Sequence, residues 1–542
     1  MPHRVWLSAI ALVAGVGLLA TAALAGPGQT KGGTLRIARA RDVDSVDPAL
    51  AYLTDTWAIE FATCATLYSY PDKPAPEGAV LIPEVAKGFP IVSKDGKTQT
   101  IELNRGYRFH TGQAVMASNF VAAFNRDANP KMGSPATAYL HDLVGANAVI
   151  DGKAQTVAGV RALGPYTLQI RTTTPLGDLP ARLATPFFCP IATNTPLTEV
   201  DDPLGSGPYY VASRIRNRQV VIERNRFYRG SRPANVDRIV FTISAPDACR
   251  AAVEQDDLDY CSFLPPTAYQ ELAAKYGVNK GRFFFNPTLG LYYFAFNHDR
   301  PAFKGQGQIP LMQAINWALD RRALAGAAGY LPGIRTDQIL PPAMGRDVSI
   351  YPLGGVTDRS LARARSLLAM AKLKPKTLVL YASSTGSKGI DPIWAQIFQF
   401  DLKRLGIDVD VRYFPHPSQL ERAGIRGEPF DVVISSWIPD YADGNAFFEP
   451  LLSGGVIKAS GNYNFSYFDR PKYNREIARI GRLAGEAREQ AWADLDVEMM
   501  RNDPPMAPFL NLVVKDFVSK SFGCYVFQPA IGFLDLVAAC KK

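Results

Sequence analysis

Residues 376–414 carry the pattern that most restricts the fold, because strand-like and helix-like spacings of apolar residues alternate there. The run TLVLY (377–381) is typical of a buried strand, and IDVDVRYF (407–414) alternates apolar with polar residues. Between them, residues 391–407 place apolar side chains near one helical face and stop at Gly406, a common helix end. Strand, helix and strand in this order predict a parallel βαβ unit and an α/β fold.

The stretch FDVVISSWIPDYAD (430–443) adds a candidate binding loop after the next apolar run. FDVVI (430–434) predicts a strand, so SSWIPDYAD (435–443) is expected on a loop at the carboxyl end of that strand. Ligands of open α/β sheets bind beyond such carboxyl ends. The loop sets aromatic rings beside the acid Asp440, and this combination favours a binding role.

Other segments predict hairpins and helices around this unit. Residues 32–40 alternate like a first strand, and residues 91–103 predict a hairpin around an Asp-Gly turn pair. A second hairpin is expected over residues 209–224, and Pro310 is expected to start a helix. The length of 542 residues, of which 47% are hydrophobic, indicates more than one domain and a large core.

The first 25 residues have the three parts of a secretory signal peptide. MPHR is a short basic region, an apolar run rich in Ala and Gly follows, and Ala23-Leu24-Ala25 is a small-x-small cleavage site. We therefore expect cleavage before Gly26 and a periplasmic or secreted protein. No cysteine lies near the cut, so no lipid anchor is expected, and no later run is long and apolar enough to span a bilayer.

The charge of the chain argues against nucleic acid as a partner. The sequence has 59 basic and 50 acidic residues, and the signal peptide removes only Arg4, which leaves 59 − 1 = 58 basic residues and a net charge of +8. The basic residues are spread along the chain and form no block interleaved with aromatic residues. Ordinary surface charge explains this distribution.

Six cysteines in an oxidising compartment predict disulfides. Six cysteines allow 15 connectivities, and no C-x-x-C motif indicates a thioredoxin-like or zinc site. Short loops favour Cys249–Cys261 and Cys524–Cys540, which leaves Cys64–Cys189.

Five segments occur in a recognisable order along the chain. They are GGTLRIARARDVDSVDPA (32–49), residues 81–126 with an Arg-Gly-x-x-Phe-His-x-Gly turn, GSGPY (205–209) with RNRFY (224–228), FAFN (294–297) with INWALDRRAL (315–324), and SWIPDYAD (436–443). Together they resemble the extracytoplasmic solute-binding proteins of peptide-type ABC importers, the oligopeptide- and dipeptide-binding family. The resemblance covers nearly the whole chain after the signal peptide.

This resemblance implies a two-lobed periplasmic-binding-protein-like α/β fold with an extra domain inserted in the first lobe. Two chain crossings, expected near 286–293 and 504–511, would form a hinge on which the lobes close around a ligand. The expected boundaries are 1–25 for the signal peptide, 26–65, 195–288 and 507–542 for the first lobe, 66–194 for the inserted domain, and 289–506 for the second lobe.

The resemblance also assigns roles to residues near the 435–443 loop. Asp440 is similar to the family's acid that pairs with the α-ammonium group of a peptide, and the alternative is an aspartate that only caps the loop. A buried carboxylate is costly alone, and an arriving cation offsets that cost. Asp443 is the second candidate for the same role. Lys388, in the loop SSTGSKGID, is the only basic candidate for a ligand carboxylate there.

Four aromatic residues complete the candidate site. Trp437 and Tyr441 are expected to line a side-chain pocket, and the alternative is that they pack against the hinge. Tyr292 and Tyr293 lie at the first expected crossing, and strand alternation allows only one of them to face the cleft.

No motif in the sequence indicates catalysis or a metal. The five histidines form no H-E-x-x-H or other ligand spacing, and no G-x-S-x-G is present. We therefore expect a non-enzymatic, monomeric receptor without a cofactor, which binds a peptide or peptide-like solute and delivers it to the permease of an ABC importer. The alternatives are a receptor of the same fold for a sugar, a nickel chelate or another small solute, a chaperone-like or signalling binder, and a secreted hydrolase or peptidase.

Overall fold

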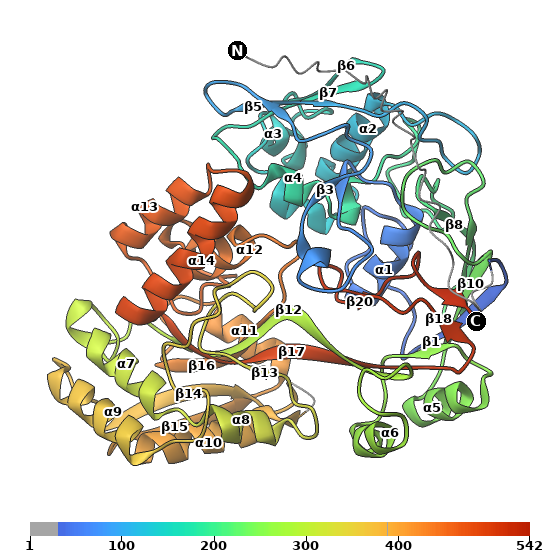
Figure 1. The fold of residues 1–542 in the computed structure, drawn as a ribbon. Coiled ribbons are helices and arrows are strands. Elements are labelled where there is room, and N and C mark those ends of the chain that lie inside the picture. The colour runs from blue at the N-terminus through green and yellow to red at the C-terminus, as the bar shows by residue number, and fades with distance from the viewer. Residues whose placement is uncertain (1–30, 387–388) are drawn as a thin grey trace, which may run out of the picture.

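The computed structural model describes residues 31–386 and 389–542. The predicted signal peptide and Lys388 lie outside the described residues. Figure 1 shows two lobes joined by two long strands, β12 (Phe283–Phe296) and β17 (Met506–Val518). We call residues 31–282 with 519–542 the first lobe, and residues 297–505 the second lobe. The predicted crossing at 286–293 lies within β12, and the one at 504–511 overlaps the first part of β17 but begins two residues before it.

The first lobe combines a strand-rich half with a smaller helical and hairpin region. Its elements are β1 (Thr34–Arg39), α1 (Thr54–Thr63), β2 (Tyr68–Ser69), β3 (Ile82–Pro83), β4 (Ile91–Val92), β5 (Thr98–Glu102), α2 (Ala117–Ala128), α3 (Ala146–Ile150), β6 (Val160–Gly164), β7 (Thr167–Arg171), α4 (Leu179–Arg182), β8 (Tyr209–Ile215), β9 (Gln219–Arg224), β10 (Arg238–Ile243), α5 (Pro246–Gln255), β11 (Tyr260–Cys261), α6 (Tyr269–Tyr276), β18 (Phe522–Gly523), β19 (Phe527–Gln528), β20 (Phe533–Leu534) and β21 (Cys540–Lys541).

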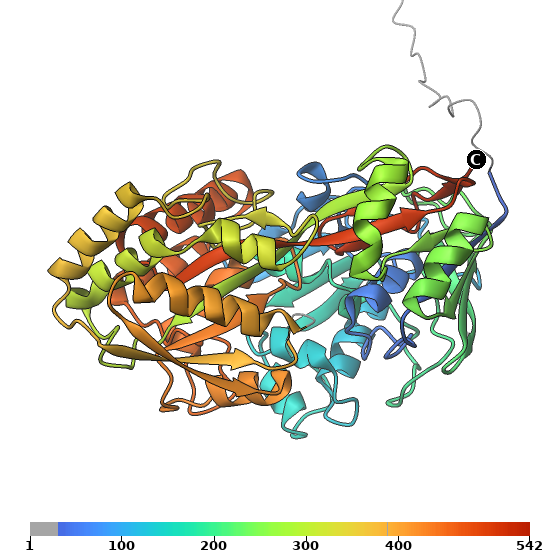
Figure 2. The same cartoon turned by 90° about the horizontal axis from the view of Figure 1, so that it is seen from below.

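The second lobe is an α/β arrangement with helices on both faces of its strands (Figure 2). Its elements are α7 (Ile309–Ala318), α8 (Arg321–Ala327), β13 (Ile334–Arg335), α9 (Asp358–Met370), β14 (Thr377–Ser383), α10 (Asp391–Lys403), β15 (Asp408–Phe414), α11 (His416–Ala423), β16 (Val432–Trp437), α12 (Asn445–Leu452), α13 (Pro471–Ile480) and α14 (Gly485–Asn502).

One mixed sheet continues through both lobes. Its strand order is β15-β14-β16-β12-β17-β11-β1-β10-β9-β8, with β13 paired to β17 as an additional strand. β12 pairs antiparallel with β17 along most of its length, and its register shifts between Pro287 and Leu291. Beyond this shift, β12 also pairs with β16 of the second lobe, while β17 pairs with β11 of the first.

The predicted βαβ unit is confirmed. β14 and β15 pair in parallel, and α10 connects them. The hairpins at 91–103 and 209–224 are also confirmed, as the antiparallel pairs β4–β5 and β8–β9. Gly96 in the first turn has a φ of 72°, which an Asp-Gly turn supplies at low cost. Pro310 lies in the first turn of α7, as expected.

The prediction that all of residues 435–443 form a loop is wrong. β16 continues to Trp437, because Ser435, Ser436 and Trp437 pair with the antiparallel strand β12. The loop begins only at Ile438, so Asp440 still follows the carboxyl end of the strand.

Alternation along β12 separates two cores in the second lobe. Phe294 and Phe296 pack with residues of α7, α9 and α10, whereas Leu291, Tyr293 and Ala295 pack with residues of α12, α13 and α14. This is the period of two expected of a strand covered on both faces.

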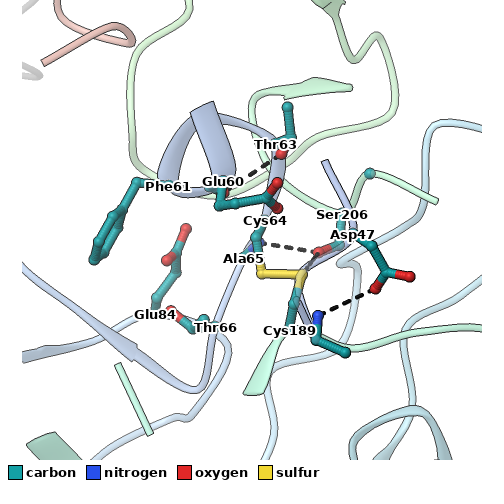
Figure 3. The surroundings of a disulfide bond; sticks show 12 residues. Asp47, Glu60, Phe61, Thr63, Cys64, Ala65, Thr66, Glu84, Cys189 and Ser206 are labelled. Atoms are coloured by element: carbon teal, nitrogen blue, oxygen red, sulfur yellow. Dashed lines mark hydrogen bonds between the residues drawn. A yellow bond between two sulfur atoms is a disulfide. The ribbon is translucent and has the colours of Figure 1, made fainter. Parts of the chain in front are cut away.

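All three disulfides have the predicted pairing, Cys64–Cys189, Cys249–Cys261 and Cys524–Cys540. Cys64 directly follows α1, and Cys189 lies 125 residues later in the sequence, so this bond joins the two ends of residues 65–188 (Figure 3). Beside it, the backbone N–H of Ala65 donates to the Ser206 hydroxyl at 2.9 Å. The domain boundaries themselves stay predictions, and we call residues 66–194 the inserted segment.

Among the described helices, none combines the length and the apolar character needed to cross a membrane.

Candidate functional site

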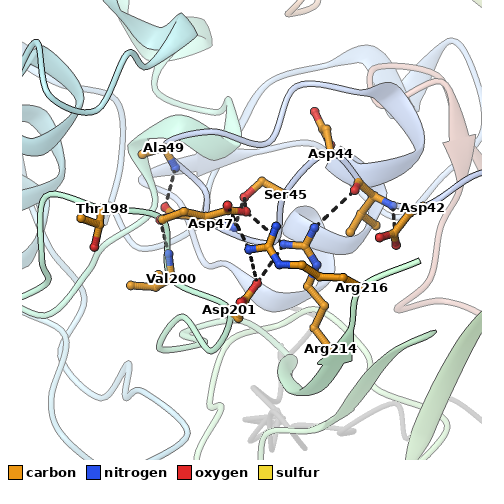
Figure 4. A network of polar contacts seen from close by, with 12 residues as sticks. Asp42, Asp44, Ser45, Asp47, Ala49, Thr198, Val200, Asp201, Arg214 and Arg216 are labelled. Carbon is orange, nitrogen blue, oxygen red and sulfur yellow. Dashed lines mark hydrogen bonds and ion pairs between the residues drawn. The ribbon is translucent and has the colours of Figure 1, made fainter. Parts of the chain in front are cut away.

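The loop after β1 is fixed by a buried ion pair. Arg126 donates to both carboxylate oxygens of Asp47, at 2.7 and 2.6 Å. The same carboxylate accepts backbone N–H bonds from Ala49 and Val200, at 3.1 and 3.0 Å (Figure 4). A two-pronged Arg–carboxylate contact is both strong and directional, so it holds the loop in one conformation.

This loop presents Tyr52 to the boundary between the lobes. The carboxylate of Asp44 accepts N–H bonds from Tyr52 and Leu53, at 2.7 and 3.0 Å, and thereby fixes the turn before α1. The Tyr52 ring stacks on Phe187 and meets the edge of Trp57, with centroids 6.0 and 5.8 Å apart. Tyr52 therefore belongs to an aromatic cluster of the first lobe.

Asp440 lies opposite this cluster, on the second-lobe loop that follows β16. Its carboxylate accepts hydrogen bonds from the hydroxyl of Tyr52, at 3.2 and 3.3 Å, and from the hydroxyl of Tyr139. Burial raises the pKa of Asp440, and the two tyrosine hydrogen bonds oppose that rise only in part. Within residues 31–386 and 389–542, no Lys, Arg or His side chain forms an ion pair with it.

A cavity of about 50 Å³ lies beside Asp440, and we call it the acid cavity. Four parts of the chain supply its walls: the first-lobe loop with α1, the first-lobe segment 529–532, the second-lobe loop after β16, and the region of β12 where the register shifts. Its lining includes Tyr52, Trp57, Thr288, Leu289, Ile438, Pro439, Asp440 and Ile531. The acid therefore lies where the lobes meet, next to a space that a small cationic group can enter.

Tyr441 forms a second contact between the lobes. It is buried, and its hydroxyl donates to Asp178 of the inserted segment at 2.7 Å. The same carboxylate accepts from Asn445 at 3.0 Å and from Arg182 at 2.9 Å. Burial opposes ionisation of Asp178, but the charges of Arg182 and Arg488 outweigh it and lower its pKa. Tyr441 is not among the residues that line the acid cavity.

The other predicted site residues lie outside the acid cavity. Trp437 donates from Nε1 to the carbonyl of Ala446 at 2.8 Å, and its ring meets the edge of Tyr463. Asp443 accepts two bonds from Arg488, at 2.7 and 2.8 Å, so its charge is already paired.

Tyr292 and Tyr293 face opposite sides of β12, as strand alternation predicts. Tyr293 is buried in the core beneath α12–α14, whereas Tyr292 is half-buried and packs against Trp394 and Phe509. Neither of them lines the acid cavity.

Comparison with known proteins decides the family. The model of the bacterial extracellular solute-binding proteins, family 5, matches residues 80–459. The chain belongs to this family. Its members are non-enzymatic solute-binding proteins, and the predicted family membership is confirmed.

Several relatives of this family 5 protein have named ligands. It is 25% identical over 451 residues to the periplasmic murein peptide-binding protein MppA of Escherichia coli, covering 80% of each chain. It is 24% identical over 453 residues to the periplasmic oligopeptide-binding protein OppA of Haemophilus influenzae, covering 79% of this chain and 81% of that one.

Solved structures confirm the two-lobed fold of the family 5 protein. The clavulanic acid biosynthesis oligopeptide-binding protein 2 superposes with a TM-score of 0.83 at 26% identity, covering 95% of this chain and 96% of that one. The unliganded open form of MppA gives 0.79 at 22% identity, covering 95% and 99%.

The two hydroxyl donors at Asp440 were not found from the sequence. Tyr52 is 388 positions from Asp440 and Tyr139 is 301 positions from it, so no local spacing links them. The one available signal for Tyr52 is its place just after the Asp-Pro loop that the family resemblance picks out. In the described part of this family 5 protein, no group of three or more His, Cys, Asp or Glu side chains could hold a metal ion.

Proposed function

We propose that this family 5 protein is an extracytoplasmic receptor that captures a peptide or peptide-like solute by its α-ammonium group and delivers it to the permease of an ABC importer. The observation that carries the proposal is the partly buried carboxylate of Asp440, which has tyrosine donors but no ion-pair partner among the described residues. An ammonium group provides both the missing positive charge and N–H donors. Charged hydrogen bonds contribute roughly 1.5–3 kcal/mol each.

The names of the relatives support the same ligand class. They are described as binding oligopeptides and murein peptides. The position of Asp440 supports hinge closure around the ligand, because the two lobes supply opposite walls of the acid cavity. A ligand held between both walls favours the closed arrangement over an open one.

The test compares a peptide that has a free amino terminus with the same peptide after N-acetylation. By isothermal titration calorimetry, we expect the free peptide to bind at least about tenfold more tightly, and Asp440→Asn to remove most of the difference. Glu421→Gln, which changes an exposed acid on α11, is the matched control. Equal affinities of both peptides, or an unchanged difference in Asp440→Asn, would show that ammonium capture is wrong.

The receptor role is distinguished from a hydrolase by the fate of the ligand. Because we propose binding without chemistry, mass spectrometry after long incubation should recover the peptide intact. Turnover of the peptide would overturn the proposal and support a secreted peptidase.

Export is the remaining part of the proposal. We expect the mature chain to begin at Gly26 and to leave cells with the periplasmic fraction after osmotic shock. Mass spectrometry of the intact protein from that fraction measures the cleavage site, and a chain that retains residues 1–25 would contradict it.

A further inference from the structure

A second and larger cavity lies between the inserted segment and the second lobe. Its volume is about 700 Å³, within the range typical of sites for small organic molecules. We call it the junction cavity. The inserted segment contributes Val80, Leu81, Phe89, Pro90, Val92, Leu176 and Pro180 among others, and the second lobe contributes Leu340, Ala343, Met344, Arg482, Arg488, Glu489 and Trp492 among others.

The junction cavity is separate from the acid cavity. Its lining includes neither Asp440 nor the tyrosines that donate to it. Both cavities touch the loop between β16 and α12, but Tyr441 lies between their contact points on this loop. The buried hydrogen bond from Tyr441 to Asp178 thus stands where the two cavities approach each other.

Direct backbone contact holds the two walls of the junction cavity together. The N–H of Gly177 donates to the carbonyl of Gly481 at 2.9 Å across the junction. A Cβ atom at position 177 would lie 2.1 Å from the carbonyl oxygen of Leu483, so only glycine allows this approach. The cavity is therefore formed by this arrangement of the lobes, in which the two walls are in direct backbone contact.

Some charged side chains around the junction cavity form ion pairs, and others do not. Asp443 and Arg488 pair with each other and leave no net charge on the wall. Arg482, which is exposed, forms no ion pair within the described ranges, and neither does the exposed Glu489. Burial, together with Asp443 and Glu486, raises the pKa of Glu489, so its negative charge is disfavoured there.

A buried donor in the wall is also unsatisfied. Trp492 is 1% exposed and stacks on Phe448, yet its Nε1–H has no acceptor in the part of the chain that the structure describes. Buried donors normally have partners, so a donor without one marks a place where an acceptor is missing. The apolar wall thus combines an unpaired guanidinium group at its rim with an unused donor.

From these features we propose that the junction cavity binds an amphiphile with an apolar body and a single carboxylate head. The apolar body packs against the side chains of both walls, and the carboxylate pairs with Arg482, whose planar guanidinium matches a carboxylate in two-pronged geometry. The proposal does not depend on the peptide-binding function, because Asp440 lines only the acid cavity and Arg482 lines only the junction cavity.

The test uses decanoate, below the concentration at which it forms micelles, with the full chain and no peptide present. Isothermal titration calorimetry should show saturable binding, and 1-decanol, which lacks the charge, should bind at least about tenfold more weakly. Arg482→Gln should reduce the affinity for decanoate to that of the alcohol.

Two tryptophan variants test the location. Ala343→Trp fills the junction cavity and should abolish decanoate binding, whereas Ala487→Trp, at an exposed position of α14 outside the lining, should leave it unchanged. Thermal unfolding checks that each variant is folded. If Ala343→Trp does not fold, the decanoate affinity of Arg482→Gln tests the proposal instead. No saturable binding, equal affinity of decanoate and decanol, or equal effects of the two tryptophan variants would overturn the proposal.

Discussion

The hydroxyl of Tyr139, in the inserted segment, donates a hydrogen bond to the carboxylate of Asp440, in the second lobe. The bond crosses the boundary between the lobes and joins residues 301 positions apart in the chain. It stabilises the ionised acid, while burial between the lobes opposes ionisation. The charge state of Asp440 therefore depends on how the lobes are arranged.

The raised pKa of Asp440 predicts that peptide affinity falls as the solution becomes acidic. An ammonium group binds the ionised carboxylate, so affinity should begin to fall at a pH above the ordinary aspartate value of 3.8. It should also fall above about pH 8, where the α-amino group of the peptide loses its proton. Calorimetry over this pH range measures the profile.

Proton release provides the control for this profile. Binding lowers the pKa of Asp440, so near that pKa a proton should leave on binding, and buffers of different protonation enthalpy reveal it. Asp440→Asn should abolish both the release and the acidic limb. An affinity that stays constant down to pH 3.8 would contradict the prediction.

Replacing Tyr139 by Phe should weaken the binding of free-amine peptides by roughly tenfold near the pKa of Asp440, because the acid loses a donor that favours its charged form. The acidic limb of the affinity profile should move to higher pH. Tyr52→Phe is the matched comparison and should have a smaller effect, since Tyr52 is 48% exposed and its contacts are 3.2 and 3.3 Å long. The opposite ranking would show that Tyr52 is the main donor.

Asp178→Asn should lower the free energy of unfolding by about 3–5 kcal/mol at neutral pH, because it breaks a buried ion pair and leaves Arg182 with only the more exposed Asp142 as a charged partner. Urea denaturation measures the change. Arg182 has a second partner, Asp142, whose side chain is 42% exposed. Asp142→Asn should therefore lower the free energy of unfolding by less than about 1 kcal/mol.

The pH dependence of the Asp178 effect has a defined sign. The folded-state pKa of Asp178 is lowered, so its stabilisation is complete above the unfolded value of 3.8 and is lost as the pH falls through the folded pKa. The stability difference between the original protein and Asp178→Asn should therefore be constant from pH 7 to about pH 5 and shrink only below 3.8. A difference that disappears at neutral pH would contradict this account.

Two of the three disulfides, Cys64–Cys189 and Cys249–Cys261, should differ in their contribution to stability because they close very different lengths of chain. In the chain-entropy model, Cys64–Cys189 closes a span of 125 residues and stabilises by about 5 kcal/mol. Cys249–Cys261 closes 12 residues and stabilises by about 3 kcal/mol. Paired Cys→Ser variants, compared by urea denaturation, should follow this order, and a larger loss for the short loop would show that chain entropy is not the main term.

Local patterns predicted much of the fold. The βαβ unit at 376–414, both hairpins and the helix at Pro310 were predicted because each depends on spacing or turn residues within a few positions. The extent of β16 was not predicted, because its last three residues are strand only through pairing with β12, and that pairing is not visible in the local sequence.

The candidate site was predicted only in part for the same reason. The family resemblance pointed to Asp440 and its loop, but the donors Tyr52 and Tyr139 come from distant segments that meet it only in the folded chain. The pairing of Asp443 with Arg488 likewise depends on how α14 packs against the loop.

The sheet that runs through both lobes affects how the protein unfolds. β12 pairs with β16 of the second lobe, β17 pairs with β11 of the first lobe and β13 of the second, and the two strands pair with each other, so the loss of one lobe removes ladder partners from the strands that hold the other. The lobes, although they look separable, are therefore expected to melt in one cooperative transition. In a calorimeter, that coupling would give a single endotherm whose van't Hoff enthalpy matches the measured heat.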